Sequence, residues 1–310
     1  MYYENITIDK SLELYGWGWV EPSNSIIHGV NTSKVVSIDT SDVKISGFII
    51  ENASKNGNND YCVSIGYKNC DVIVNDCLIR NFTNAGIVCW HSSNYNKITG
   101  NQIVIEGDVN CGILQYYCIG TMIERNFIKR VSYEDSQHAM GVGIELINSY
   151  LITVRNNHIW YLSRSIDLYE SLKCDIESNN MLPSHSGIGL FDSSYNNLLN
   201  NDIFFTNYGF GISISDGIAN NISFNDICGA DIGMLFYDSS DNTVYRNNFE
   251  TNNIDATFYN DNFSPNIWEQ NYWGKERVFP KIIIGQIGDI ERSIRWFNVD
   301  WHPATEPYEI

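Results

Sequence analysis

A short segment that recurs along the chain constrains the fold more than any other feature. Each copy has apolar residues at its first and sixth positions, as in ITGNQI from Ile98 and VRNNHI from Val154. The fourth position forms a column of Ser46, Asn75, Asn101, Asn126, Asn157, Asn179, Asn201, Asn225, Asn247 and then Asn271. Most steps between copies are 22 to 26 residues, too few for a unit that buries its own apolar face. We therefore expect the copies to stack as the coils of a solenoid.

A second column of apolar residues indicates that the coils are built from β-strand. It consists of Val63, Ile87, Ile113, Ile144, Ile166, Ile188, Ile212 and Met234. In most coils a second apolar residue follows two positions later, so the inward set includes Leu146, Leu168, Leu190 and Ile214. Alternation with a period of two is typical of a strand with one face in the core, and no repeat has room for a helical crossover.

Together these patterns predict an all-β fold, a single right-handed parallel β-helix of about ten coils. We expect the helix to occupy residues 1–274 and the irregular residues 275–310 to cap its open end within the same domain. The Asn column is expected at one corner of the coil. Asparagine tolerates the left-handed conformation of a tight turn, and stacked amides can also bond along the solenoid as an asparagine ladder.

The charge of the chain excludes several classes of partner. It has 19 Lys and Arg against 37 Asp and Glu, a formal net charge of −18 that repels nucleic acid and anionic membranes. The sequence contains no long apolar run, so we predict no membrane span. The chain opens on a strand-like segment without a signal peptide. We expect a truncated N-terminus and an extracellular or cell-surface location.

The eight cysteines do not form CxxC pairs, which argues against a zinc or thioredoxin-like site. Several fall on core columns of the repeat, so we predict buried thiols that act as small apolar side chains. We predict no cofactor and no metal. The acidic surface leaves calcium open, but no motif indicates it.

Extra chain enters the repeat at one corner, and we place the candidate site beside it. The longest connections lie around residues 52–60 and 131–141, and insertions on one edge often form the binding face of a solenoid. The adjoining strand presents outward aromatic residues on successive coils. The candidate ligand-binding residues are Trp90, Tyr116, Tyr169, Phe191, His138, His185 and Arg164.

Glu145 and Asp167 occupy the same outward position on adjacent coils, about 5 Å apart at the backbone. Carboxylates this close perturb each other's pKa, which suits acid/base catalysis on a glycosidic bond, so both are catalytic candidates. Structural alternatives exist for each feature. Outward aromatics stabilise a sheet through same-face pairs, and Arg164 can bridge the two acids.

The opening YYENITIDKSLELYG, the repeated N-N-x-I segments and the closing NYWG and DWHPATEPYEI resemble the NosD-like, PbH1-repeat β-helix proteins of archaea and bacteria. The resemblance implies a surface or periplasmic protein, in a group that includes carbohydrate-binding proteins and sugar hydrolases. The member that gives the group its name is linked to copper delivery, which requires clustered Met, His or Cys ligands. The nearest approach here is His138-Ala139-Met140. The Asp-Asp pair, Gly-His-Gly and Arg-Ile-Lys of β-helix polygalacturonases are absent.

Three functional hypotheses follow. The first is a cell-surface or secreted protein that binds a polysaccharide or surface glycan on the outward aromatic and acidic face. The second is a polysaccharide-acting enzyme, a hydrolase, lyase or epimerase, that uses Glu145 and Asp167. The third is a purely structural surface or assembly protein.

Overall fold

The computed structural model describes residues 1–18, 25–30, 33–53, 60–106, 111–131, 141–183, 185–205, 209–260, 265–288 and 293–310. The chain forms two compact units, residues 1–162 and residues 163–310. Within the described ranges the secondary structure is strand and turn, with no helix. The described ranges therefore contain no helix that could cross a membrane.

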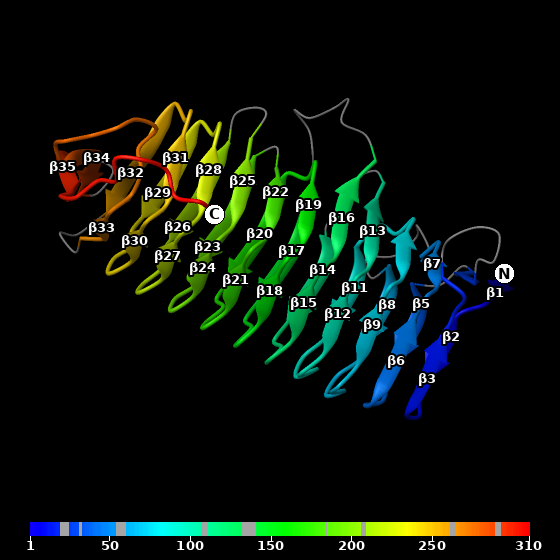
Figure 1. Ribbon diagram of the computed structural model, residues 1–310. Coiled ribbons are helices and arrows are strands. Elements are labelled where there is room, and N and C mark those ends of the chain that lie inside the picture. The colour runs from blue at the N-terminus through cyan, green and yellow to red at the C-terminus, as the bar shows by residue number, and fades with distance from the viewer. Residues whose placement is uncertain are drawn as a thin grey trace. The chain divides into compact units, whose positions relative to one another are not determined.

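The first unit consists of three parallel sheets whose strands follow one another in the order A, B, C around each coil (Figure 1). Sheet A contains β1 (Tyr2–Tyr3), β4 (Ile26–His28), β7 (Ile49–Glu51), β10 (Leu78–Arg80), β13 (Gln102–Ile105), β16 (Phe127–Arg130) and β19 (His158–Trp160). Sheet B contains β2 (Ile6–Ile8), β5 (Lys34–Ile38), β8 (Tyr61–Ile65), β11 (Ala85–Cys89), β14 (Cys111–Tyr116) and β17 (Val142–Ile147). Sheet C contains β3 (Leu12–Tyr15), β6 (Val43–Ser46), β9 (Ile73–Asn75), β12 (Lys97–Thr99), β15 (Met122–Glu124) and β18 (Thr153–Arg155).

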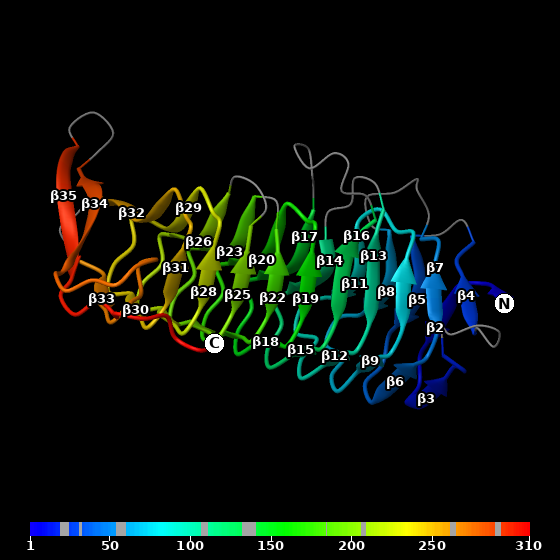
Figure 2. The same ribbon diagram turned by 45° about the horizontal axis from the view of Figure 1, so that its top comes forward.

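The second unit repeats the same three-sheet coil (Figure 2). Its sheet A contains β22 (Asn180–Leu182), β25 (Asp202–Phe204), β28 (Asp226–Cys228) and β31 (Asn248–Glu250). Its sheet B contains β20 (Arg164–Tyr169), β23 (Ser186–Phe191), β26 (Phe210–Ser215), β29 (Ile232–Tyr237), β32 (Ile254–Asn260), β34 (Lys281–Ile287) and β35 (Ile294–Asp300). Its sheet C contains β21 (Asp175–Glu177), β24 (Asn197–Leu199), β27 (Asn221–Ser223), β30 (Thr243–Tyr245) and β33 (Ile267–Glu269).

The predicted fold class is confirmed: the chain is an all-β parallel β-helix of about ten coils. The core is formed by the apolar columns of sheet B, together with matching columns of sheets A and C. The eight predicted inward residues are completely buried: Ile144, Leu146, Ile166, Leu168, Ile188, Leu190, Ile212 and Ile214. Stacked coils thus bury an apolar face that a single coil cannot.

The asparagine ladder is also confirmed. In the first unit the Asn101 side-chain amide donates to Asn126 Oδ1 at 3.0 Å, and Asn126 donates to Asn157 at 3.0 Å. In the second unit each amide donates to the next, at 2.9–3.1 Å, along Asn179, Asn201, Asn225, Asn247 and Asn271. Each Oδ1 also accepts the backbone N–H of the preceding ladder residue, as Asn225 does for Asn201 at 3.0 Å. The ladder therefore satisfies polar groups at a buried corner.

Two members of the predicted column are wrong. Asn75 pairs with Thr99, and Ser46 pairs with Asn75, so neither lies in register with a ladder asparagine. Cys77 occupies the ladder position instead, since its N–H donates to Asn101 Oδ1. In these two coils the ladder position lies two residues after the predicted one. A register shift of two residues leaves every side chain on its expected face, so the apolar pattern does not reveal the shift.

The left-handed conformation expected of the Asn column belongs to a different position. The residue immediately before the ladder asparagine has positive φ in each of these coils, and it is Gly100, Arg125, Asn156, Ser178, Asn200, Phe224, Arg246 or Gln270. The ladder position thus selects asparagine for its buried amide. The tight corner is made by its neighbour, which points to the surface and has no fixed residue type.

The final strands close the second unit through Asp300, which is completely buried at the end of β35. Its Oδ2 accepts the N–H of Asn271 at 2.9 Å and the indole N–H of Trp273 at 3.1 Å. A carboxylate therefore ends the ladder where the next coil would have supplied an amide oxygen. The hairpin of β34 and β35 is antiparallel and pairs with β32 at Tyr259 and Asn260.

Candidate functional site

The predicted aromatic column lies on the outward face of sheet B, at the ends of its strands. In the first unit Trp90 follows β11 and Tyr116 ends β14, with ring centroids 5.9 Å apart in an edge-on arrangement. Two further rings join them. His91 lies 4.7 Å from Tyr116, edge-on, and stacks 4.7 Å from Tyr117 at an angle of 13°. Tyr117 is exposed, whereas the other three are half-buried.

Nearer the starts of the strands, the outward face of sheet B carries buried apolar side chains. Val88 is completely buried and clusters with Tyr61, Ala85, Cys111 and Val142. Trp90 and Leu114 pack against this cluster, so the aromatic group rests on a dry apolar floor along one side. Such packing fixes the ring planes before any ligand arrives and so lowers the entropic cost of binding.

Glu145 lies on β17 and pairs in register with Leu114 of β14. Its side chain is half-buried on the outward face, one strand along from the aromatic group. This position allows the carboxylate to take part in polar contacts at the edge of the group.

In the second unit Asp167 has quite different surroundings. Its side chain is completely buried on β20, and Oδ2 forms an ion pair with Arg164 Nη1 at 2.6 Å. Arg164 also donates to the Tyr169 hydroxyl at 2.7 Å, and the Tyr169 ring stacks on Phe191 at 4.7 Å and 10°. Gly189 leaves the space that Asp167 requires, because a Cβ there would lie 2.6 Å from Oδ1.

This arrangement limits what Asp167 can do chemically. A completely buried, ion-paired carboxylate cannot reach a glycosidic oxygen unless its surroundings move. Glu145 and Asp167 belong to different units, and their pairing as two catalytic acids stays a prediction. His185 is exposed just before β23, and His138 lies outside the described residues, as does most of residues 52–60 and 131–141.

The strand bounds place both of these connections at the predicted corner. The first joins β7 of sheet A to β8 of sheet B, and the second joins β16 of sheet A to β17 of sheet B. His91 and Tyr117 were not among the predicted residues, because both follow the strand in a segment that indicates only a turn. The signal available was the aromatic pair in VCWHSSNYN and in LQYYC.

The comparisons with known proteins agree with this fold. The profile of a family described as "Periplasmic copper-binding protein (NosD)" matches residues 112–286, which is more than half of the chain. The chain belongs to the NosD family. No curated protein matches it significantly.

Two enzymes are among the solved structures that resemble this NosD-family chain, both at low sequence identity. One is DFA-IIIase from Arthrobacter chlorophenolicus A6 in complex with GF2, with TM-score 0.60, 14% identity, and coverage of 85% of this chain and 73% of the enzyme. Another is the periplasmic alginate epimerase AlgG, with TM-score 0.59, 15% identity, and coverage of 76% and 60%. At these identities the likeness establishes the fold alone.

Copper is implied by the family description, and the donors in the described ranges do not fit a copper site. There, no three His, Cys, Asp or Glu side chains are grouped as a metal site would require. Burial raises the pKa of Cys62 and Cys118 to about 12, which disfavours the thiolate that a metal needs. His138 and Met140 lie outside the described residues.

Proposed function

We propose that this protein binds carbohydrate outside the cytoplasm, through the aromatic group of Trp90, His91, Tyr116 and Tyr117. The observation that carries the proposal is the packing of four rings at the ends of β11 and β14, three of them half-buried and one exposed. Flat rings held on a dry floor offer apolar area to a sugar ring, and their polar edges can bond its hydroxyls. The family description supports a periplasmic or surface location.

A binding role is favoured over catalysis by the environment of Asp167. The second acid that an enzyme of this type requires is buried and held by Arg164, whereas the aromatic group needs no movement to meet a ligand. Catalysis by Glu145 and Asp167 is kept as an outcome of the test below, as is a purely structural role.

The test replaces Tyr117 by Asn, which tolerates the positive φ of 55° at this position. The ring is lost from an exposed turn, so folding should be unaffected, and binding in a glycan array should fall about tenfold. The matched control is Tyr195→Asn, since Tyr195 is also exposed and has a φ of 59° in a turn of the second unit. Unchanged binding by the Tyr117 variant would reject the proposed site.

A second variant separates binding from turnover. Glu145→Gln removes the charge and keeps the size of the side chain. If the protein only binds glycans, this variant should bind as the wild type does, with no reducing sugar or unsaturated product formed by either protein. Release of product by the wild type and its loss in Glu145→Gln, with binding retained, would establish the enzyme instead.

A further inference from the structure

A separate cleft of about 440 Å³ lies on the outward face of sheet A in the first unit. Its floor comes from β10 and β13, and β16 forms one wall. Cations and apolar groups both line it, the most important being Arg80, Val104, Glu106, Lys129, Arg130 and Tyr161. The volume falls within the range of small-ligand sites and would hold one or two sugar residues. It involves none of the residues of the aromatic group on sheet B.

Strand register places two cations on one row of this cleft. Arg80 of β10 pairs with Val104 of β13, and Val104 pairs with Lys129 of β16. The residues before them in each strand, Ile79, Ile103 and Ile128, are completely buried, so the row itself faces outward. Adjacent strands lie about 4.8 Å apart, which places Arg80 and Lys129 on either side of a small apolar residue.

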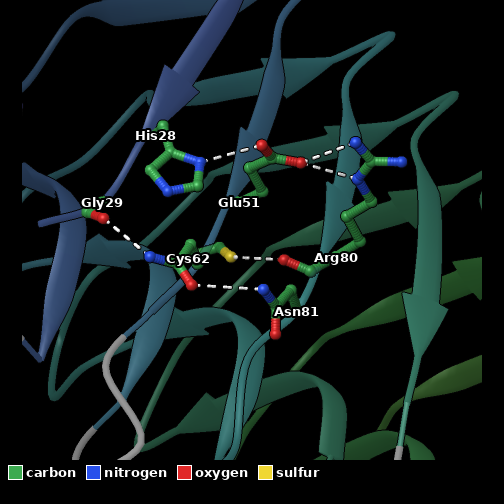
Figure 3. Close-up of polar contacts among 7 residues, drawn as sticks. His28, Gly29, Glu51, Cys62, Arg80 and Asn81 are labelled. Carbon is green, nitrogen blue, oxygen red and sulfur yellow. Dashed lines mark hydrogen bonds and ion pairs between the residues drawn. The ribbon is translucent and has the colours of Figure 1, made fainter. Parts of the chain in front are cut away.

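Arg80 is held in place by an ion pair at the edge of the cleft (Figure 3). Its Nε donates to Glu51 Oε2 at 2.7 Å, and the other oxygen of Glu51 lies 2.9 Å from His28 Nδ1. Burial alone would raise the pKa of Glu51, but hydrogen bonds from His28 and Arg80 outweigh it and lower the pKa. A charged Glu51 thus orients the guanidinium, while 41% of the Arg80 side chain stays exposed. This is a preorganised donor rather than a loose surface arginine.

Lys129 has a different environment. Its ammonium lies 5.4 Å from the centroid of Phe127, and no carboxylate in the described ranges forms an ion pair with it. Three cations and one acid, Glu106, line the cleft, and a second acid, Glu51, pairs with Arg80 at its edge, in a chain whose net charge is −18. A local excess of positive charge on an acidic protein attracts an anion from solution.

We propose that this cleft binds an anionic oligosaccharide, with a carboxylate or sulfate of the ligand between Arg80 and Lys129 above Val104. Arg80 supplies directed hydrogen bonds to the anion, and Lys129 supplies a mobile charge. Tyr161 and the aliphatic floor contact the sugar ring, and the Gln102 amide is available to a hydroxyl. The site is independent of the one proposed on sheet B.

The test measures calorimetric binding of oligogalacturonate and of a sulfated oligosaccharide, with neutral malto-oligosaccharide for comparison. We expect the wild type to bind one or both of the anionic probes, more weakly as salt increases, and not the neutral one. Val104→Glu places a carboxylate between the two cations and should abolish binding. Val104→Gln, which adds a side chain of the same size without the charge, should retain most of it.

Lys129→Ala should weaken binding about tenfold, since it removes a charge-assisted contact. Lys97→Ala is the matched control, because Lys97 is exposed on sheet C of the same unit. Thermal melts of all four variants should stay close to that of the wild type, as each position is on the surface. The proposal is overturned if neither anionic probe binds, if the neutral probe binds equally well, or if Val104→Glu and Lys129→Ala bind as the wild type does. Loss of glycan binding in Tyr117→Asn would not contradict this proposal, because Tyr117 does not line the cleft.

Discussion

The buried side-chain amide of Asn225 forms hydrogen bonds that link three coils. Its Oδ1 accepts from the backbone and the side chain of Asn201, and its Nδ2 donates to Asn247 Oδ1 and to the Leu198 carbonyl, all within 3.0 Å. The side chain is completely buried. Every hydrogen-bonding position of the amide is used, so no other residue type can satisfy the same set of partners.

Replacing Asn225 by Asp should therefore destabilise the second unit although the two side chains have the same shape. The change removes the Nδ2 donor and places a carboxylate against two carbonyl oxygens. We expect a loss of about 2–4 kcal/mol in the free energy of unfolding, measured by urea denaturation. Asn221→Asp, at an exposed position on β27 of the same coil, should change stability by less than about 0.5 kcal/mol. Similar effects of the two substitutions would mean that the ladder contributes little.

Single residues also mark the limits of inference from the sequence. The ladder was predictable because an asparagine that recurs in a buried column requires an amide partner. The burial of Asp167 was not predictable. The alternation correctly placed this side chain on the outward face of its strand, but it gave no indication that the outward face is covered at this point. Burial of an outward residue depends on what packs over the sheet from elsewhere in the chain, which a period of two cannot reveal.

Among the strands, sheet A of the second unit brings two acids into direct register. Asp202 of β25 pairs with Asp226 of β28, and Asn180 donates to Asp202 at 2.7 Å. Burial, followed by the negative charges of Asp202 and Glu250, raises the pKa of Asp226 to about 6. Because the folded chain binds this proton more tightly than the unfolded chain, its stability should fall as the pH rises from about 4 to above 6.

Asp226→Asn removes that dependence. Above pH 6 the variant should be more stable than the wild type by about 1 kcal/mol, a value reduced to allow for the partial exposure of the site. The difference should shrink as the pH falls toward 4, where folded Asp226 is protonated and the unfolded carboxyl, with its ordinary pKa of 3.8, becomes so as well. Thermal or urea unfolding between pH 4 and pH 8 measures it, with the exposed Asp192→Asn as a control that should show no such trend. A constant difference across this range would contradict the shifted pKa.

The strand-level prediction was strongest where coils are short and regular. The inward columns of sheet B follow from alternation alone, and the corner that accepts extra residues follows from spacing. The cleft on sheet A could not be found this way. Arg80, Val104 and Lys129 differ in type, and only the register of β10, β13 and β16 shows that they form one row.

At the scale of the whole chain, the two units share one repeating coil, and the cysteines are distributed through both. No disulfide joins any of the eight, all of which lie in the described ranges. Six are buried: Cys62, Cys77, Cys89, Cys111, Cys118 and Cys174, whereas Cys70 and Cys228 are half-buried. The prediction that most of the cysteines are buried thiols is confirmed. They fill core positions where a larger side chain would displace a neighbouring coil.

These thiols should report on opening of the solenoid. Burial raises the pKa of Cys77 to about 11 and those of Cys62 and Cys118 to about 12, so at pH 8 their reactive thiolates are scarce as well as inaccessible. Pulse labelling with N-ethylmaleimide, followed by intact mass spectrometry, should therefore add two groups to the native protein and eight to the unfolded protein. A variant with both Cys70→Ser and Cys228→Ser should add none until denaturant is present.

The same labelling separates the two units. Cys62, Cys77, Cys89, Cys111 and Cys118 lie in the first unit and Cys174 in the second. The coils of a solenoid interact mainly with their nearest neighbours, so one unit can open while the other stays folded. At intermediate urea we expect species with the five thiols of one unit labelled and Cys174 still protected, or the reverse. Simultaneous labelling of all six at every urea concentration would show instead that the chain unfolds as one cooperative body, and more than two adducts on the native protein would contradict the burial of the thiols.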